Sequence, residues 1–237
     1  AICNVPESAI VRETALRFIT RAGPEIGVAS TKAFTSQLVA LSLITLMIAR
    51  KKKTIRKEEG QRIVQELLSL PEKVAKVIES TTAQVRYIAE EFSDATNFLY
   101  LGRGYNFPVA LEGALKLKEI TYAHCEGMLS TEFKHGPLSA VSKGFPIIFV
   151  SDGSATPLII SGLNEVKVRG ARTIVIAEED SRLRANADDV ILLPKSDSQI
   201  SALLGVLPLQ LLSYHMSVMR GFDPDFPRNL SKTLTVD

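Results

Sequence analysis

The second half of the chain alternates short apolar runs with stretches of helical periodicity, and this alternation restricts the possible folds most. Each run lacks the polar alternation of a half-exposed strand, as expected for a parallel sheet that helices cover on both faces. The expected strands are Phe98–Leu101, Pro146–Ser151, Thr173–Ala177 and Val190–Leu193, and the expected helices are Phe107–Tyr122, Pro157–Arg169 and Ile200–Arg220. The pattern predicts an α/β fold with a doubly wound parallel sheet over about residues 83–222.

A strongly apolar helix is expected near the start of the chain, over Ala33–Ala49, and the basic cluster Arg50–Lys53 follows it. An apolar helix with a positive flank is typical of a membrane span. The uninterrupted stretch from Leu38 has only about twelve residues and carries Ser42 and Thr45, so it is too short to cross a bilayer. We expect a buried core helix or an interface helix, and no membrane association.

Three further stretches have weaker patterns. Ala1–Val5 and Arg17–Thr20 are strand-like, and Gln61–Phe92 has a helical spacing that Pro71 divides into two helices. The last fifteen residues, 223–237, contain two prolines and no periodicity, as in a disordered terminus.

The start of the apolar helix is a candidate binding site. A turn is expected at Gly23–Gly27, and Ser30 or Thr31 can cap the helix that follows. The free backbone N–H groups of a helix start suit an anionic or hydroxyl-rich ligand. A simple N-cap without a ligand explains the same residues.

The helix after the first strand of the sheet carries three charged residues on one stripe. The strand ends at Gly102–Gly104, and Asn106 is the expected N-cap, with a proline in the first turn, where a missing N–H is harmless. Glu112, Lys116 and Glu119 then follow at i, i+4 and i+7, so they share one face. A lysine between two carboxylates just beyond a strand end is suited to binding and acid–base chemistry. A solvated ion-pair face is the alternative.

A histidine completes the candidate acid–base set. His135 precedes Gly136–Pro137, in what should be an exposed turn sixteen residues after Glu119. We expect the carboxylate, the amine and the imidazole to converge. A histidine with a purely structural role in the turn is the alternative. The three histidines of the chain have no metal-ligand spacing, so no metal and no cofactor are expected.

Composition excludes several classes of protein. The net charge of +2 predicts no affinity for nucleic acid, and the basic residues around Lys53 are followed at once by Glu58 and Glu59. Cys3 and Cys125 have no pairing pattern, which indicates free thiols in a reducing, cytoplasmic compartment. No signal peptide is recognisable, and the start at Ala1 rather than Met suggests a piece of a longer protein.

Four stretches carry a family resemblance. Leu111–Glu119 with Lys134–Pro137, Ala22–Thr35 and Pro227–Lys232 resemble the isomerase region of the glucosamine-6-phosphate synthases, the glutamine–fructose-6-phosphate aminotransferases. The resemblance implies flavodoxin-like sugar-isomerase (SIS) domains. It assigns residues 1–54 to a partial first SIS domain, 55–82 to a helical linker, 83–222 to a second SIS domain and 223–237 to a loop that reaches the active site.

The resemblance also implies roles for individual residues. The substrate would be fructose 6-phosphate and the product glucosamine 6-phosphate, with a glutaminase domain upstream and a homodimer in which the neighbouring subunit donates the histidine. Glu119 would move the proton between C1 and C2, Lys116 assist at a hydroxyl, His135 open the ring and Lys232 form an imine, while Val28, Ser30 and Ser231 would bind the sugar.

Two departures from the family keep alternatives open. Phe133 stands between Glu132 and Lys134, where the synthases typically have leucine. A phenylalanine in this motif is closer to the pattern of SIS-type amino-sugar-phosphate deaminases and deglycases. The serine- and threonine-rich phosphate loop of a first SIS domain and the glutaminase domain are not found in this sequence. The alternatives are therefore a deaminase or deglycase, and a non-catalytic SIS module that senses phosphosugars.

Overall fold

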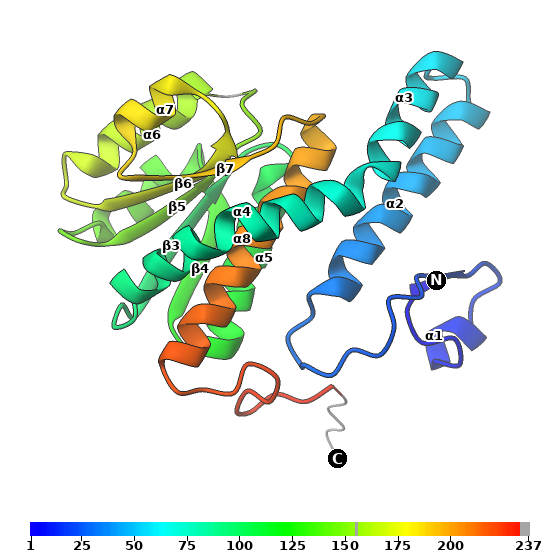
Figure 1. Ribbon diagram of the computed structural model, residues 1–237, viewed down its shortest axis with the longest axis horizontal. Helices are drawn as coiled ribbons and strands as arrows, with labels where there is room; N and C mark the ends of the chain where they lie inside the picture. The colour runs from blue at the N-terminus through cyan, green and yellow to red at the C-terminus, as the bar shows by residue number, and fades with distance from the viewer. Residues whose placement is uncertain (155, 233–237) are drawn as a thin grey trace.

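A five-stranded parallel sheet forms the centre of the molecule in the computed structural model, which describes residues 1–154 and 156–232 (Figure 1). The strand order is β4-β3-β5-β6-β7, so the chain starts inside the sheet, adds one edge and then returns to build the other. This is the flavodoxin-like doubly wound order, which confirms the expected fold class. The strands are β3 (Asn97–Gly102), β4 (His124–Leu129), β5 (Pro146–Val150), β6 (Arg172–Glu178) and β7 (Asp189–Leu193).

Helices cover both faces of the sheet, and alternate strand residues divide into two cores. Phe98 and Tyr100 of β3 face α5 and α8, whereas Leu99 and Leu101 face α6 and α7. We call these the α5 face and the α6 face. On the α5 face, α4 packs outside α8. The helices are α4 (Leu70–Glu91), α5 (Asn106–Thr121), α6 (Thr156–Lys167), α7 (Ser181–Asn186) and α8 (Ser198–Met219), with short 3₁₀ helices η1 (Glu132–His135) and η2 (Pro137–Ala140) after β4.

The edge strand β4 was not predicted from the sequence. Of its six residues only Cys125 is fully buried, whereas His124 and Glu126 are exposed, so no apolar run marks the strand. Gly127 lets α5 lie close against it, because a Cβ there would come within 2.8 Å of the Leu111 Cα. The strand is therefore stabilised by its pairing with β3 and by close packing against α5. Neither contact can be recognised from the residues of the strand alone.

The predicted N-cap of α5 is wrong by one residue. Tyr105 occupies the N-cap position, and Asn106 is the first helical residue, with only 1% of its surface exposed. The predicted position of Pro108 in the first turn is confirmed. As the first helical residue, Asn106 is buried, whereas Tyr105 before it is exposed.

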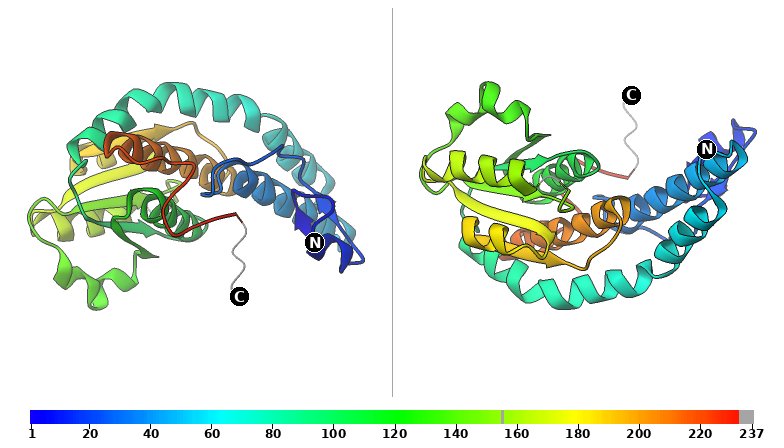
Figure 2. Two further views of the ribbon diagram at one scale, coloured as in Figure 1. Left: turned by 90° about the horizontal axis from the view of Figure 1, so that it is seen from below. Right: turned by 90° about the horizontal axis from the view of Figure 1, so that it is seen from above.

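The N-terminal part of the chain lies beside the sheet domain (Figures 1 and 2). The two strand-like stretches form a parallel pair, and the division into two helices near Pro71 is confirmed, because Pro71 lies in the first turn of α4. The additional elements are β1 (Ile2–Cys3), α1 (Ala9–Arg12), β2 (Phe18–Ile19), α2 (Lys32–Lys51) and α3 (Lys57–Leu68).

The helix α2 is not the buried core helix that the sequence allowed. Within the described residues only Ala33 and Ala40 of α2 are buried, while Leu41 and Met47 are 49% and 62% exposed. Phe34 and Leu38 pack against the α5-face core, so one side of the helix is held and the other is open. Both α2 and α8 are long and apolar enough to span a membrane by composition alone. This is weak evidence, because most of α8 is buried in the core.

The two cysteines should differ in reactivity. Burial raises the pKa of Cys125 to about 12, whereas a hydrogen bond with Ser8 lowers the pKa of the partly exposed Cys3. Because the thiolate is the nucleophile, iodoacetamide at pH 8 should modify Cys3 at least about tenfold faster than Cys125. Peptide mass spectrometry after timed quenching measures both rates. Equal rates in the native protein would contradict the burial of Cys125.

Candidate functional site

The charged stripe of α5 is buried rather than solvated. Only 4% of Lys116 is exposed, and its Nζ lies 2.6 Å from Glu119 Oε2 and 3.5 Å from Glu112 Oε1. Desolvation raises the pKa of Glu112, with a contribution from the charge of Glu119, against the opposing effect of Lys116. The solvated-face alternative is therefore wrong. A buried cation between two carboxylates is costly to keep for stability alone, which favours a chemical role.

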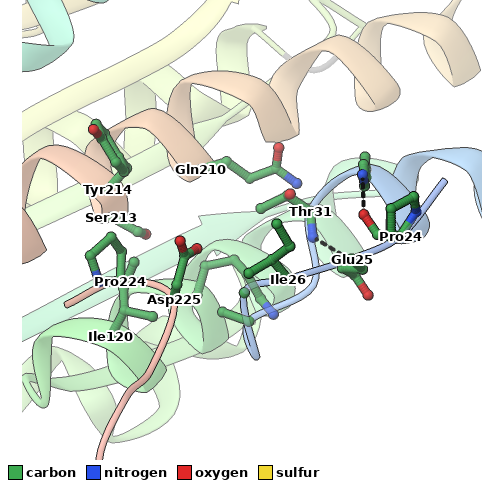
Figure 3. A pocket seen from close by; sticks show the side chains of 14 residues that line it. Pro24, Glu25, Ile26, Thr31, Ile120, Gln210, Ser213, Tyr214, Pro224 and Asp225 are labelled. Atoms are coloured by element: carbon green, nitrogen blue, oxygen red, sulfur yellow. Dashed lines mark hydrogen bonds between the residues drawn. The ribbon is translucent and has the colours of Figure 1, made fainter. Parts of the chain in front are cut away.

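Lys116 of this triad lines a pocket of about 360 Å³, which Figure 3 shows from close by. Pockets of this size accommodate small metabolites. Four parts of the chain contribute to its wall: the segment before α2, the helices α5 and α8, and the segment after α8. The polar and charged residues of the wall are Glu25, Thr31, Lys32, Lys116, Gln210, Ser213, Tyr214 and Asp225.

Glu25 connects the two ends of the chain at this pocket. Its Oε1 accepts hydrogen bonds from Ser30 Oγ at 2.9 Å and from the Thr31 N–H at 3.3 Å. Its Oε2 accepts one from Lys232 Nζ at 2.7 Å. Thr31 is the N-cap of α2, but its own side chain makes no capping hydrogen bond. The carboxylate of Glu25 accepts a hydrogen bond from the backbone at this helix start instead. Two residues predicted to act on the sugar, Ser30 and Lys232, are thus joined through a residue that was not predicted.

The charge of Glu25 is stabilised by these partners. Partial burial acts to raise the pKa of Glu25, but the hydrogen bonds from Lys232 and Ser30 outweigh it, so the pKa lies below its ordinary value. The sequence pattern places Glu25 only in the turn Gly23–Gly27. A glutamate five residues before a serine at a helix start was the available signal, because such spacing lets an acidic side chain fold back onto the N-terminus.

The segment 223–232 packs against the rest of the chain, so the prediction of a disordered terminus is wrong for these residues. The Val28 N–H donates to the Asp225 carbonyl at 3.0 Å. The Arg228 N–H donates to the Tyr122 hydroxyl at 2.9 Å, and the Arg228 guanidinium lies 4.0 Å from the centre of the Tyr122 ring. Ser231 lies next to Lys232 in this segment, and residues 233–237 of the predicted loop lie outside the described residues.

The predicted convergence of His135 with the triad is not found within this chain. His135 is exposed in η1 and does not line the pocket. The neighbouring Phe133 is buried in the α6-face core, on the other side of the sheet from α5. The segment of η1 and η2 lies apart from the segment 223–232 in both views of Figure 2. Within the described residues no group of three or more His, Cys, Asp or Glu could hold a metal ion.

The chain matches the SIS domain family over residues 1–47 and 91–220. It is 48% identical, over its whole length, to the glutamine–fructose-6-phosphate aminotransferase (isomerizing) of Chlorobaculum tepidum and 45% identical to that of Pseudomonas aeruginosa. The chain spans only 38% and 39% of those relatives, about two-fifths of their length.

Solved structures agree with this match. The C-terminal domain of the glucosamine-fructose-6-phosphate aminotransferase of Francisella tularensis superposes with a TM-score of 0.91 at 42% identity, over 95% of this chain and 64% of that one. A glucosamine-6-phosphate deaminase of Thermotoga maritima superposes with a TM-score of 0.74 at 24% identity, over 99% of this chain and 66% of that one, which supports a common fold alone.

Proposed function

The chain belongs to the SIS domain family, and from this premise we propose that it is the sugar-isomerising part of a glutamine–fructose-6-phosphate aminotransferase. In this proposal it converts fructose 6-phosphate and ammonia into glucosamine 6-phosphate. The observation that carries the proposal is the buried Lys116 between Glu112 and Glu119, beside a pocket lined by Glu25, the residue that binds Lys232. The names of relatives at 42–48% identity support the same substrate class.

The residues divide the chemistry among them. The Lys232 amine forms an imine at C2 of the open-chain ketose, and ammonia then displaces the lysine. Glu119 carries the proton between C1 and C2, since one carboxylate can reach both carbons. Lys116, held at 2.6 Å from Glu119, donates to a sugar hydroxyl, and Val28, Ser30 and Ser231 bind the sugar. A histidine titrates near neutral pH and suits ring opening, which we assign to His135.

The assembly belongs to the same proposal. A homodimer would bring His135 of one subunit to the pocket of the other, and a glutaminase domain upstream would supply ammonia. The division into domains at residues 54, 82 and 222 is supported by the SIS match, which omits residues 48–90. We place the reaction in the cytoplasm, with no nucleic-acid or membrane partner.

Substitution of Lys232 by Arg tests the proposed function most directly. The charge and the contact with Glu25 can persist, but a guanidinium does not form an imine at neutral pH. Amino-sugar formation should fall by more than about a hundredfold in the protein that carries this chain. Borohydride reduction in the presence of fructose 6-phosphate should attach the sugar to Lys232 in the wild type. An adduct on another lysine would contradict the assignment.

Mixing two inactive variants tests whether the histidine comes from the partner. Random dimers of His135→Ala and Glu119→Gln chains should regain about one quarter of the wild-type activity, because half are mixed and each mixed dimer has one intact site. The assay follows glucosamine 6-phosphate after co-refolding at equal concentration. Each variant alone is the control. No recovery in isolated mixed dimers would indicate that each site is built within one chain.

A further inference from the structure

The ion pair between Glu25 and Lys232 joins parts of the chain that are 207 positions apart. One oxygen of the carboxylate is fixed by the start of α2, through Ser30 and Thr31, and the other holds the lysine. The anchor lies at the N-terminus of the twenty-residue helix α2, because Thr31 is its N-cap and Ser30 is the residue before it. The Lys232 amine is therefore held from the start of α2 as well as by the segment that carries it.

A second set of contacts limits where this segment can lie. The Val28 N–H bonds to the Asp225 carbonyl, and a Cβ on Gly27 would lie 2.7 Å from Asp225 Oδ1. Glycine at position 27 thus permits the close approach of the two segments. Lys232 lies seven residues beyond this contact, and Glu25 is the partner that holds its side chain.

The ion pair between Lys232 and Glu25 favours one position of the Lys232 amine, yet it can also break. The side chains of Lys232 and Glu25 are 38% and 19% exposed, so water competes with the pair. Partly exposed pairs of this kind contribute little to stability. The contact can therefore loosen enough for the Lys232 nitrogen to react while the Glu25 carboxylate stays beside it, without disrupting the fold.

We propose that Glu25 is a positioning residue that holds the Lys232 nitrogen at the mouth of the pocket and acts as its counter-ion during imine formation. The proposal rests on the proposed function, because it takes Lys232 as the imine-forming amine. Beyond the proposed function, Glu25 is assigned the role of keeping the positively charged nitrogen of Lys232 in one place.

The chemistry explains why a fixed counter-ion suits this step. The nitrogen–carbon bond forms as the carbon–oxygen bond of the ketone breaks, and the oxygen leaves as water with two of the three ammonium hydrogens. The protonated imine keeps the single positive charge on the same nitrogen. A fixed anion beside the nitrogen stabilises the positive charge that develops there as water leaves the neutral carbinolamine. The lowered pKa of Glu25 agrees with a carboxylate that stays ionised.

Glu25→Gln separates this role from a structural one. The amide keeps an oxygen for Ser30 and Thr31 but has no charge for Lys232. In the protein that carries this chain, the rate of borohydride trapping on Lys232 at saturating fructose 6-phosphate should fall roughly tenfold, with the half-saturating sugar concentration within about twofold of wild type. Trypsin should cleave after Lys232 about two- to fivefold faster without sugar.

Two variants complete the experiment. Glu25→Asp restores the charge with a shorter reach and should recover part of the trapping rate. Glu179→Gln removes an ion pair with Arg184, on an exposed loop after β6, and should behave as wild type. Melting temperatures of all variants identify any that unfold, and the Asp variant then decides on its own whether the charge matters.

The outcomes distinguish this inference from the proposed function. Trapping on Lys232 that is unchanged in Glu25→Gln would overturn the role of Glu25 and leave the proposed function intact. A loss that saturating sugar fully restores would also overturn it, since Glu25 would then act in sugar binding. No wild-type adduct on Lys232 would overturn both.

Discussion

Replacement of Glu119 by Gln should lower the rate of amino-sugar formation by roughly 10²–10⁴-fold, the usual loss for a missing catalytic base. The amide has the same size but cannot accept a proton from carbon. Lys116 keeps the Glu112 carboxylate at 3.5 Å, so its charge remains compensated and the fold should persist. The measurement is the initial rate of glucosamine 6-phosphate formation in the protein that carries this chain, together with its melting temperature.

A matched variant controls for the loss of a carboxylate. Glu126 lies exposed on the edge strand β4, and Glu126→Gln should leave the rate within about twofold of wild type, as surface substitutions usually do. Activity of Glu119→Gln within about threefold of wild type would remove this residue from the proton transfer, since a base contributes far more.

Substitution of Gly102 by Ala should destabilise the fold by about 3 kcal/mol or more. A Cβ at this position would lie 2.1 Å from the Asn106 carbonyl oxygen and 2.8 Å from the Phe107 Cα. These are backbone atoms of the first turn of α5, so relief requires the helix to move away from β3. The measurement is the free energy of unfolding in urea.

Gly60→Ala provides the comparison for this substitution. The new Cβ would meet Arg50 Cδ at 2.9 Å, an atom of a flexible and exposed side chain that can turn away. Alanine also favours the interior of α3, so this variant should be neutral or more stable by up to about 1 kcal/mol. Equal stability of the two variants would mean that the strand-to-helix turn after β3 is not tightly packed.

Local sequence patterns were sufficient to predict the strands whose residues are all apolar. Every residue of β5 is buried, and such a run has few other interpretations. Two of the six residues of the edge strand β4 are exposed and only one is buried. The helix α7 has only six residues, so neither element had a readable period. The sequence left open whether α2 is a core helix or an interface helix, because its composition suits both positions.

The candidate site divides in the same way. Lys116 and Glu119 share one helix face, so their spacing alone predicted the stripe. Glu25 and Tyr122 act through contacts with Lys232 and Arg228, over 100 residues away in the chain. Sequence spacing has no means of indicating such a partner. The location of His135 on the α6 face follows from the burial of Phe133, which is also a tertiary event.

The contact between Glu25 and Lys232 also has a consequence for the order of folding. A contact between positions 207 residues apart closes a very large loop, and such contacts form after the local ones that shorten the loop. The sheet and its helices should therefore assemble first, and the two end segments should dock on a nearly complete domain. During refolding, circular dichroism should recover before Lys232 becomes trappable by borohydride. The ability of Lys232 to form an imine would then appear only in the last step of folding.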